Sequence, residues 1–245
     1  MIQARALTRT FKGVPAVRGV DLDVHEGEIC GFLGPNGAGK TTTLRMLTTL
    51  LRPTSGTATV AGHDLVADPA GVRRSIGYVA QGGMFTPLSL IGEELRLQAR
   101  LHGHSAREAR RRAGEVLERL DLAGFDRRTP ASLSGGQARR ADLALGLVHA
   151  PRVLFLDEPT NGLDPRARAE LWTYIRGLRT TIFLSTHYLD EADALCDRVL
   201  IIDGGRIVAS GAPADLKRDH AAATLDEVFL TVTGRPMEDA AEAAA

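Results

Sequence analysis

Three short runs of almost uninterrupted apolar residues most constrain how this chain can fold. They lie within the stretches EICGFLG (28–34), RVLFLDEP (152–159) and TTIFLSTH (180–187). Apolar runs of this length, bounded by glycine, proline or polar residues, are typical of strands covered on both faces of a parallel sheet. A helical pattern over residues 165–178 separates the second run from the third. Strand, helix and strand therefore alternate, which predicts an α/β core.

Shorter patterns predict further elements around this core. Paired strands are expected over 4–11 and 17–28 with a turn at Lys12–Gly13, further strands over 55–65 and 74–81, and helices over 40–51, 91–103, 105–124, 134–149 and 187–196. The resulting division has a core of residues 1–81 and 151–215, which includes an N-terminal antiparallel β subdomain, and an inserted α-helical subdomain of residues 82–150. Residues 216–245 form a C-terminal extension, whose acidic, alanine-rich tail we expect to be frayed.

Composition limits the classes of function. The 245 residues carry 30 basic and 30 acidic side chains, so no net charge favours nucleic acid or an anionic membrane surface. The arginines at 107 and 110–112 could form a nucleic-acid patch, but nearby acids favour a solvated helix face. No apolar run approaches the roughly 20 residues of a membrane-spanning helix, and we expect no secretory signal. Cys30 and Cys196 lack metal-type spacing, which predicts free thiols in a reducing compartment.

The stretch GPNGAGKT directly follows the first apolar run and opens a predicted helix. It fits the pattern G-x-x-x-x-G-K-[ST], whose glycines let successive backbone N–H groups point at phosphate oxygens. Of the 30 basic residues only Lys12, Lys40 and Lys217 are lysines, so a lysine at position 40 is unusual for this chain. A compact ammonium fits between two phosphates, whereas a planar guanidinium is too broad. The loop predicts a nucleotide site, with Lys40 on the β- and γ-phosphates and Thr41 on Mg²⁺.

Two carboxylates follow the second apolar run. Asp157 and Glu158 stand where the predicted strand leaves the sheet, so both can reach the phosphates. Mg²⁺ takes few carboxylates and keeps its waters, which suits Asp157. Glu158 suits the work of a general base or of positioning a water molecule.

Further motifs occur in a fixed order around this loop. They are Gln81 before the helical insert, LSGGQ (133–137) at the start of a helix inside it, NGLD (161–164) after Glu158, and His187 at the end of the last apolar run. With this set the chain resembles the nucleotide-binding subunit of an ATP-binding cassette (ABC) transporter over about residues 2–216. The resemblance implies a P-loop NTPase core of RecA-like fold, ATP and Mg²⁺ as cofactors, and ATP hydrolysis coupled to transport.

The resemblance also implies a role for each motif. Glu158 resembles the catalytic glutamate and His187 the switch histidine on the γ-phosphate, with Lys40 and Gln81 as further catalytic residues. Thr41, Gln81 and Asp157 correspond to the residues that hold Mg²⁺. The nucleotide-binding positions are Phe11 on the adenine, Gly34, Pro35, Asn36, Gly37, Ala38, Gly39, Lys40, Thr41 and Thr42 in the phosphate loop, Ser134, Gly135, Gly136 and Gln137 in the signature, and Asp164.

One phosphate loop and one signature imply a partner. In this family the signature of one cassette caps the ATP held by another. The backbone amides after Ser134 stand at the start of a helix, where they form a second anion-binding end. The chain is therefore expected to form a head-to-tail homodimer with ATP between the copies. A separate membrane permease is the other implied partner, with no nucleic acid. This places the chain in the cytoplasm, on the inner face of the cell membrane.

The resemblance narrows to one kind of exporter. The stretches TTLLRPTSGTATVAGHDL, STHYLDEADALCDRV and LDEVFLTVTGR are similar to ATP-binding subunits of the daunorubicin- and doxorubicin-resistance type, which export hydrophobic drugs or antibiotics. The stretch GGMFTPLSLIGEEL departs from that group where a permease should dock, and RGLRTTIFLSTH is a few residues short. An exporter of polysaccharide or lipid, and a non-transport cassette ATPase acting on ribosomes or DNA, are the alternatives. A P-loop kinase would not explain LSGGQ or His187.

Overall fold

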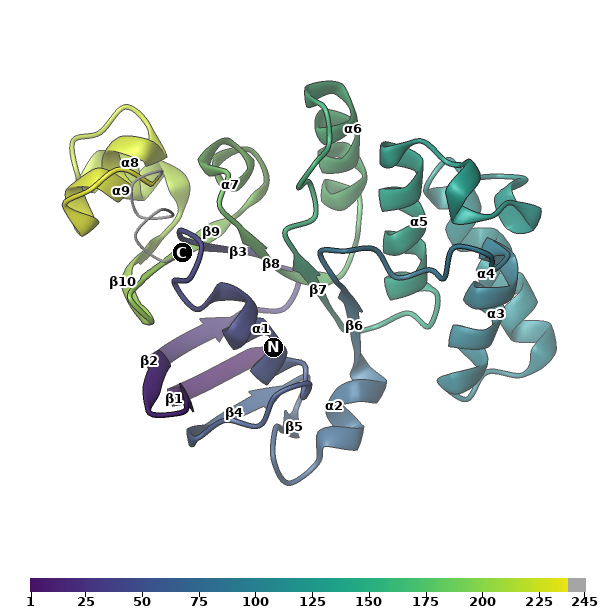
Figure 1. Cartoon of the computed structure of the whole chain (residues 1–245), viewed down its shortest axis with the longest axis horizontal. Coiled ribbons are helices and arrows are strands. Elements are labelled where there is room, and N and C mark those ends of the chain that lie inside the picture. Colours follow the sequence, from purple (N-terminus) through teal and green to yellow (C-terminus); the bar gives the residue numbers. More distant parts are fainter. Residues whose placement is uncertain (238–245) are drawn as a thin grey trace.

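A six-stranded sheet in the order β10-β9-β3-β8-β7-β6 lies at the centre of the molecule (Figure 1). The structure is a computed structural model that describes residues 1–237, so the tail predicted to fray, at 238–245, lies outside the described residues. The strands are β3 (Ile29–Leu33), β6 (Ile76–Val79), β7 (Val153–Asp157), β8 (Thr181–Thr186), β9 (Arg198–Asp203) and β10 (Arg206–Gly211). All neighbours pair in parallel except β10 with β9. Every residue of β3, β7 and β8 is buried, as their apolar runs predict.

A second, antiparallel sheet packs below the first in the order β2-β1-β4-β5 (Figure 1). Its strands are β1 (Ile2–Phe11), β2 (Val14–Val24), β4 (Ser55–Val60) and β5 (His63–Asp64). The predicted turn is confirmed, because Lys12 and Gly13 both have positive φ, at 47° and 85°. The helix α1 (Lys40–Leu47) lies between the sheets, and its Leu44 and Met46 share one core with residues of both.

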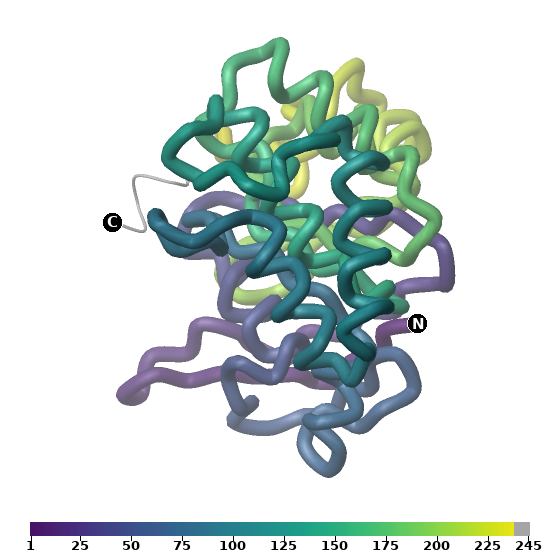
Figure 2. The backbone as a smooth tube through the Cα atoms, turned by 90° about the vertical axis from the view of Figure 1, so that its right-hand side faces the viewer, coloured from purple at the N-terminus to yellow at the C-terminus, as the bar shows by residue number. Residues whose placement is uncertain are grey.

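The remaining α-helices lie around the two sheets. They are α2 (Pro69–Ser75), α3 (Ile91–Leu101), α4 (Ala106–Arg119), α5 (Gly135–Leu147), α6 (Pro165–Arg176), α7 (Leu189–Leu195), α8 (Pro213–Asp219) and α9 (Leu225–Thr233). Helices α3, α4 and α5 gather beyond β6 at one end of the molecule, and Figure 2 shows this end facing the viewer. The predicted α/β class, with an antiparallel β part and a helical insert, is confirmed.

The structure also corrects several predicted elements. Helices α8 and α9 were not predicted, nor was α2, which Asp68 caps by accepting a hydrogen bond from the backbone N–H of Gly71 at 2.8 Å. The strand predicted from residue 74 therefore begins only at Ile76. Helix α1 ends at Leu47 rather than at residue 51, and Thr49 has a left-handed φ of 64°.

The arginine cluster on α4 is a solvated face. Arg111 pairs with Glu108 and Glu115, and Arg112 pairs with Glu108, all within one or two helical turns. Hydrogen bonding to Arg111 lowers the pKa of Glu108 to about 2. These cations already have acidic partners, which favours the solvated-face interpretation over a nucleic-acid patch. Among the described helices, none has the length and apolar character needed to cross a membrane.

Candidate active site

Residues 34–39 form a tight loop that joins β3 to α1. Two positions in it require glycine, because a Cβ on Gly34 would lie 2.3 Å from the carbonyl oxygen of Ile202, and one on Gly39 would lie 2.7 Å from that of Ala16. Gly39 also has a φ of 106° and precedes the first residue of α1. No side chain caps this helix and its first turn has no acidic residue. The open N-terminus of α1 is therefore suited to bind a phosphate group.

Lys40 is buried at the start of α1, with only 4% of its surface exposed. Its Nζ donates hydrogen bonds to the carbonyl oxygens of Gly34, at 2.7 Å, and Pro35, at 3.1 Å. The same nitrogen lies 3.6 Å from Oε1 of Glu158. Burial lowers the pKa of Lys40, and the neighbouring carboxylates of Glu158 and Asp157 oppose this shift. The ammonium thus sits in a narrow, oxygen-lined slot that the loop itself builds.

The carboxylate of Glu158 is where the predicted catalytic residues meet. Its Oε2 accepts hydrogen bonds from Nε2 of Gln81 at 2.7 Å and Nδ2 of Asn161 at 3.2 Å. Its Oε1 lies 3.2 Å from Nδ1 of His187, on the side where Lys40 also approaches. Burial raises the pKa of Glu158, but His187 and Lys40 outweigh it, so the net pKa is lowered. Glu158 is therefore a carboxylate at neutral pH.

Asp157, the last residue of β7, precedes Glu158 and has its own set of partners. Its Oδ1 accepts hydrogen bonds from Oγ of Ser185 at 2.6 Å and Oγ1 of Thr41 at 3.2 Å, and its Oδ2 from the hydroxyl of Tyr78 at 3.4 Å. A carboxylate beside a threonine hydroxyl is a hard, all-oxygen donor set that fits Mg²⁺. Within residues 1–237 no cluster of three or more acidic, histidine or cysteine side chains could hold a metal alone.

The sequence did not reveal several members of this site. Ser185 and Tyr78 were missed, and Asn161 was read only as part of a motif. Ser185 had a usable signal, because it is a polar residue that directly follows the apolar stretch Ile182–Leu184 of β8. Tyr78 and Asn161 carry no such signal, since an aromatic in a strand and an asparagine in a loop are common.

Other predicted residues lie apart from this centre. Ser134 caps α5 in a reciprocal arrangement with Gln137, so its hydroxyl accepts one hydrogen bond and can still donate another. Among the described residues, no hydrogen bond or ion pair joins residues 133–137 to residues 34–42. Asp164 caps α6, and the half-exposed ring of Phe11 lies at the β1–β2 turn beneath Arg9. The signature and the phosphate loop therefore make no direct polar contact within one copy.

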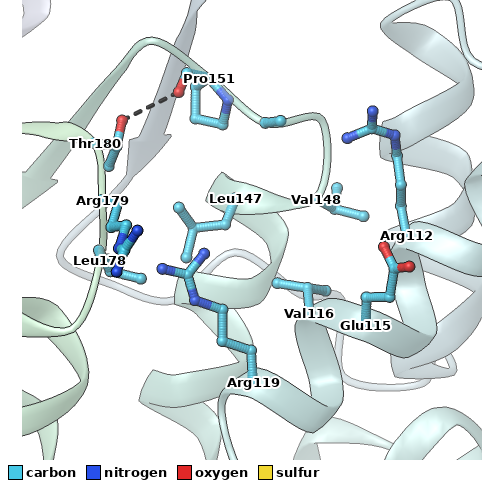
Figure 3. Close-up of a pocket in the computed structure, with 11 residues that line it drawn as sticks. Arg112, Glu115, Val116, Arg119, Leu147, Val148, Pro151, Leu178, Arg179 and Thr180 are labelled. Atoms are coloured by element: carbon cyan, nitrogen blue, oxygen red, sulfur yellow. Dashed lines mark hydrogen bonds between the residues drawn. The ribbon is translucent and has the colours of Figure 1, made fainter.

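The hollow shown in Figure 3 is a separate feature. This cavity of about 240 Å³ lies between α4, α5 and the loop before β8, and none of the predicted site residues lines it. Two of its arginines are already engaged, Arg112 with Glu108 and Arg119 with the carbonyl oxygen of Gly177. The better candidate for the active site is the region around the phosphate loop, where the N-terminus of α1 is uncapped and several side chains converge on Glu158.

Comparison with known proteins assigns the chain to a family. Residues 17–161, more than half of the chain, match the family model described as ABC transporter. The chain belongs to the ABC transporter family. It is an ATP-binding subunit with the ATPase fold of that family, a P-loop NTPase core with an antiparallel β part and a helical region, as the sequence motifs predict.

Several curated ABC proteins are similar to the chain. It is 49% identical over 217 residues to the daunorubicin resistance ATP-binding protein DrrA3 of Streptomyces coeruleorubidus, covering 87% of this chain and 69% of that protein. It is 46% identical to the daunorubicin/doxorubicin resistance ATP-binding protein DrrA of Streptomyces peucetius, covering 88% of this chain and 66% of that protein. A Nod factor export ATP-binding protein of Cupriavidus pinatubonensis is 37% identical, with 94% and 71% covered. The chain thus spans about two thirds of the length of these relatives.

Solved structures give the same family assignment. An ATP-binding subunit of an ABC transporter superposes with a TM-score of 0.85 at 29% identity, covering 95% of this chain and 99% of that chain. The ATP-binding cassette MJ0796, in a dimeric post-hydrolysis structure with ADP and Pi, has a TM-score of 0.78 at 27% identity, covering 86% and 98%. This ABC subunit therefore has the fold of structurally characterised ATPases.

The slot around Lys40 gives a first testable prediction. In Lys40→Arg the guanidinium is too broad for the slot between the loop carbonyls and Glu158, so turnover should fall about 100-fold or more. Steady-state ATP hydrolysis measures this. Lys217→Arg is a matched control, because Lys217 pairs with Asp193 on the surface and should tolerate the change. A Lys40→Arg variant with near-normal turnover would show that the slot does not discriminate by shape.

Proposed function

We propose that this chain hydrolyses ATP as a head-to-tail homodimer and so drives an exporter of hydrophobic drugs or antibiotics through a separate membrane permease. The observation that carries the ATPase part is the meeting of Gln81, Lys40 and His187 on the carboxylate of Glu158. The names of the relatives at 45–49% identity support the drug-export part. Bound to its permease, the chain would work at the cytoplasmic face of the membrane.

In this mechanism the phosphate loop and Lys40 hold the nucleotide. The ammonium of Lys40 moves from the carbonyl oxygens of Gly34 and Pro35 to the β- and γ-phosphates, because the phosphates carry full negative charge and the carbonyls only partial charge. The residues of Gly34–Thr42 other than Pro35 supply backbone N–H groups, and Phe11 stacks on the adenine. Thr41, Asp157 and Gln81 would hold Mg²⁺, and the chemistry it supplies when bound is neutralisation of phosphate charge.

Glu158 and its neighbours act on the attacking water. As a carboxylate of lowered pKa, Glu158 can orient a water molecule and accept its proton. Gln81 fixes the position of this carboxylate through its 2.7 Å hydrogen bond. His187, 3.2 Å from the same carboxylate, can donate to the γ-phosphate. Catalysis then rests on positioning and charge stabilisation, as is general for phosphoryl transfer.

The role of Glu158 is tested by its amide. In Glu158→Gln the side chain keeps its size but can no longer accept a proton, so turnover should fall about 100-fold or more while ATP binding is kept. An ATP-dependent dimer should then accumulate, as measured by size-exclusion chromatography with light scattering. Glu170→Gln, on the exposed face of α6, is the matched control and should hydrolyse ATP normally. Hydrolysis by Glu158→Gln at the wild-type rate contradicts the role.

The head-to-tail dimer predicts that two inactive variants restore one site when mixed. Lys40→Met removes the phosphate-loop cation, and Gly135→Asp places a carboxylate at the start of α5, where a Cβ has room because its nearest neighbour is 3.7 Å away. In a mixed dimer one site combines the intact Lys40 of one copy with the intact signature of the other. In a Glu158→Gln background, the mixed dimer should retain about one ATP through gel filtration and each pure variant none.

If each site were built within one copy, mixing would restore nothing. The composite site is therefore contradicted if the Glu158→Gln parent retains ATP but the mixed dimer, like the pure variants, does not.

Drug export is tested in cells. A host that expresses the chain with its co-purifying membrane permease should accumulate less daunorubicin than the same host with the Glu158→Gln chain, because only the hydrolysing form drives transport. Fluorescence of the cell-associated drug measures accumulation. Equal accumulation in both strains, with ATP hydrolysis intact in the purified complex, would contradict export of daunorubicin and favour the polysaccharide or lipid alternative.

A further inference from the structure

Arg139 is a buried arginine that donates hydrogen bonds to the backbone around Glu158. It lies on α5, two residues after the signature, and only 6% of its surface is exposed. Its Nε donates to the carbonyl oxygen of Pro159 at 2.5 Å, and its Nη2 donates to those of Glu158 at 3.1 Å and Asp157 at 3.2 Å. One guanidinium therefore binds three consecutive carbonyl groups where β7 leaves the sheet.

The same side chain also reaches the segment that carries Gln81. Nη1 of Arg139 donates to the carbonyl oxygen of Ala80 at 2.8 Å and lies 3.5 Å from Oδ2 of Asp142, one turn further along α5. The other oxygen of Asp142 accepts a hydrogen bond from the backbone N–H of Met84 at 2.9 Å. Arg139 and Asp142 thus bind the backbone on both sides of Gln81.

These contacts hold the two backbone segments that carry Gln81 and Glu158, whose side chains form a hydrogen bond with each other. Glu158 has a left-handed φ of 47°, which leaves its N–H bonded to Ser185 on β8 and its carbonyl group bonded to Arg139. Its carboxylate accepts the 2.7 Å hydrogen bond from Gln81. If either backbone shifted, the distance between these side chains would change, and with it the place of the water that Glu158 orients.

We propose that Arg139, supported by Asp142, is a positioning residue for ATP hydrolysis that sets the place of Glu158 and Gln81 by binding the backbone around both. The inference rests on the proposed role of Glu158. Arg139 touches neither the phosphate loop nor the side chain of Glu158, so it acts on the chemical step through those two residues. Its planar fork serves carbonyl groups in several directions at once, and the single ammonium of lysine cannot.

The test is a double-mutant cycle between Arg139→Lys and Glu158→Gln. Arg139→Lys alone should lower kcat about 10- to 100-fold and leave KM for ATP within about twofold, because nucleotide binding does not depend on Glu158. In the Glu158→Gln background the same substitution should leave the residual hydrolysis rate unchanged, since the group through which it acts is already lost. Rates are expressed per ATP-binding site, so that unfolded protein does not count.

The matched control is Arg140→Lys on the same helix. Arg140 donates to the carbonyl oxygen of Leu120, to Asp121 and to the hydroxyl of Tyr174, none of which flanks Gln81 or Glu158. Its kcat should stay within about twofold of wild type. A similar fall in both arginine variants would overturn the specific role of Arg139.

Other outcomes also decide the proposal. A kcat within about twofold of wild type for Arg139→Lys, or the same fold-loss with and without Glu158, overturns it while leaving the ATPase function standing. Hydrolysis by Glu158→Gln at the wild-type rate overturns the role of Glu158 and this inference together.

If Arg139→Lys does not fold, the variant Asp142→Asn decides the proposal, because it keeps an acceptor for the backbone N–H of Met84 and removes the acceptor that faces Arg139. Its kcat should fall about 10-fold, and only when Glu158 is present.

Discussion

The structure depends on keeping one buried carboxylate charged. A carboxylate as buried as Glu158 is stable only with several polar partners, because removal from water costs several kcal/mol. Those partners come from segments far apart in the sequence, namely α1, the segment after β6, the loop after β7 and the end of β8. They meet because the carboxyl ends of parallel strands share one edge of the sheet. The strand order therefore decides whether this charge can be buried.

Two partners of Glu158, Lys40 and His187, are also groups that the proposed mechanism gives to ATP. Both approach Oε1 of this carboxylate, while Gln81 donates to Oε2. A phosphate group carries the same sign of charge and offers similar oxygen acceptors. In the proposed mechanism Lys40 and His187 therefore exchange the carboxylate for a phosphate group, while Gln81 keeps its hydrogen bond to Glu158.

Much of this arrangement follows from the sequence. Buried parallel strands produce apolar runs, and the phosphate loop needs glycine where the backbone passes close to Ile202 and Ala16, so both leave a clear pattern. The short helices α2 and α8 do not, because each buries only two residues, which is too few to show periodicity, whereas α7, of the same length, buries Leu189, Ala192 and Leu195 at three-residue spacing. The boundaries between the core, the helical insert and the C-terminal extension remain predictions.

The least predictable part of the site was Arg139. Nearly all the basic residues of this chain are arginines, so one more arginine on a helix does not by itself indicate a special role. The only clue was its i, i+3 spacing from Asp142 in a helix that is otherwise apolar after residue 140. Which carbonyl groups it binds is decided by how α5 packs against β6 and β7, and such tertiary contacts are not encoded in local spacing.

The left-handed backbone of Glu158 has a consequence for the stability of the whole chain. At φ 47° a glycine would be relaxed, whereas an L-residue with a side chain costs on the order of 1 kcal/mol. A glycine there would relieve this strain but would leave the buried Lys40 without its acidic partner. The backbone is thus strained at a position where the proposed chemistry needs a carboxylate. The glutamate at position 158 is therefore explained by what its side chain does and not by what its backbone prefers.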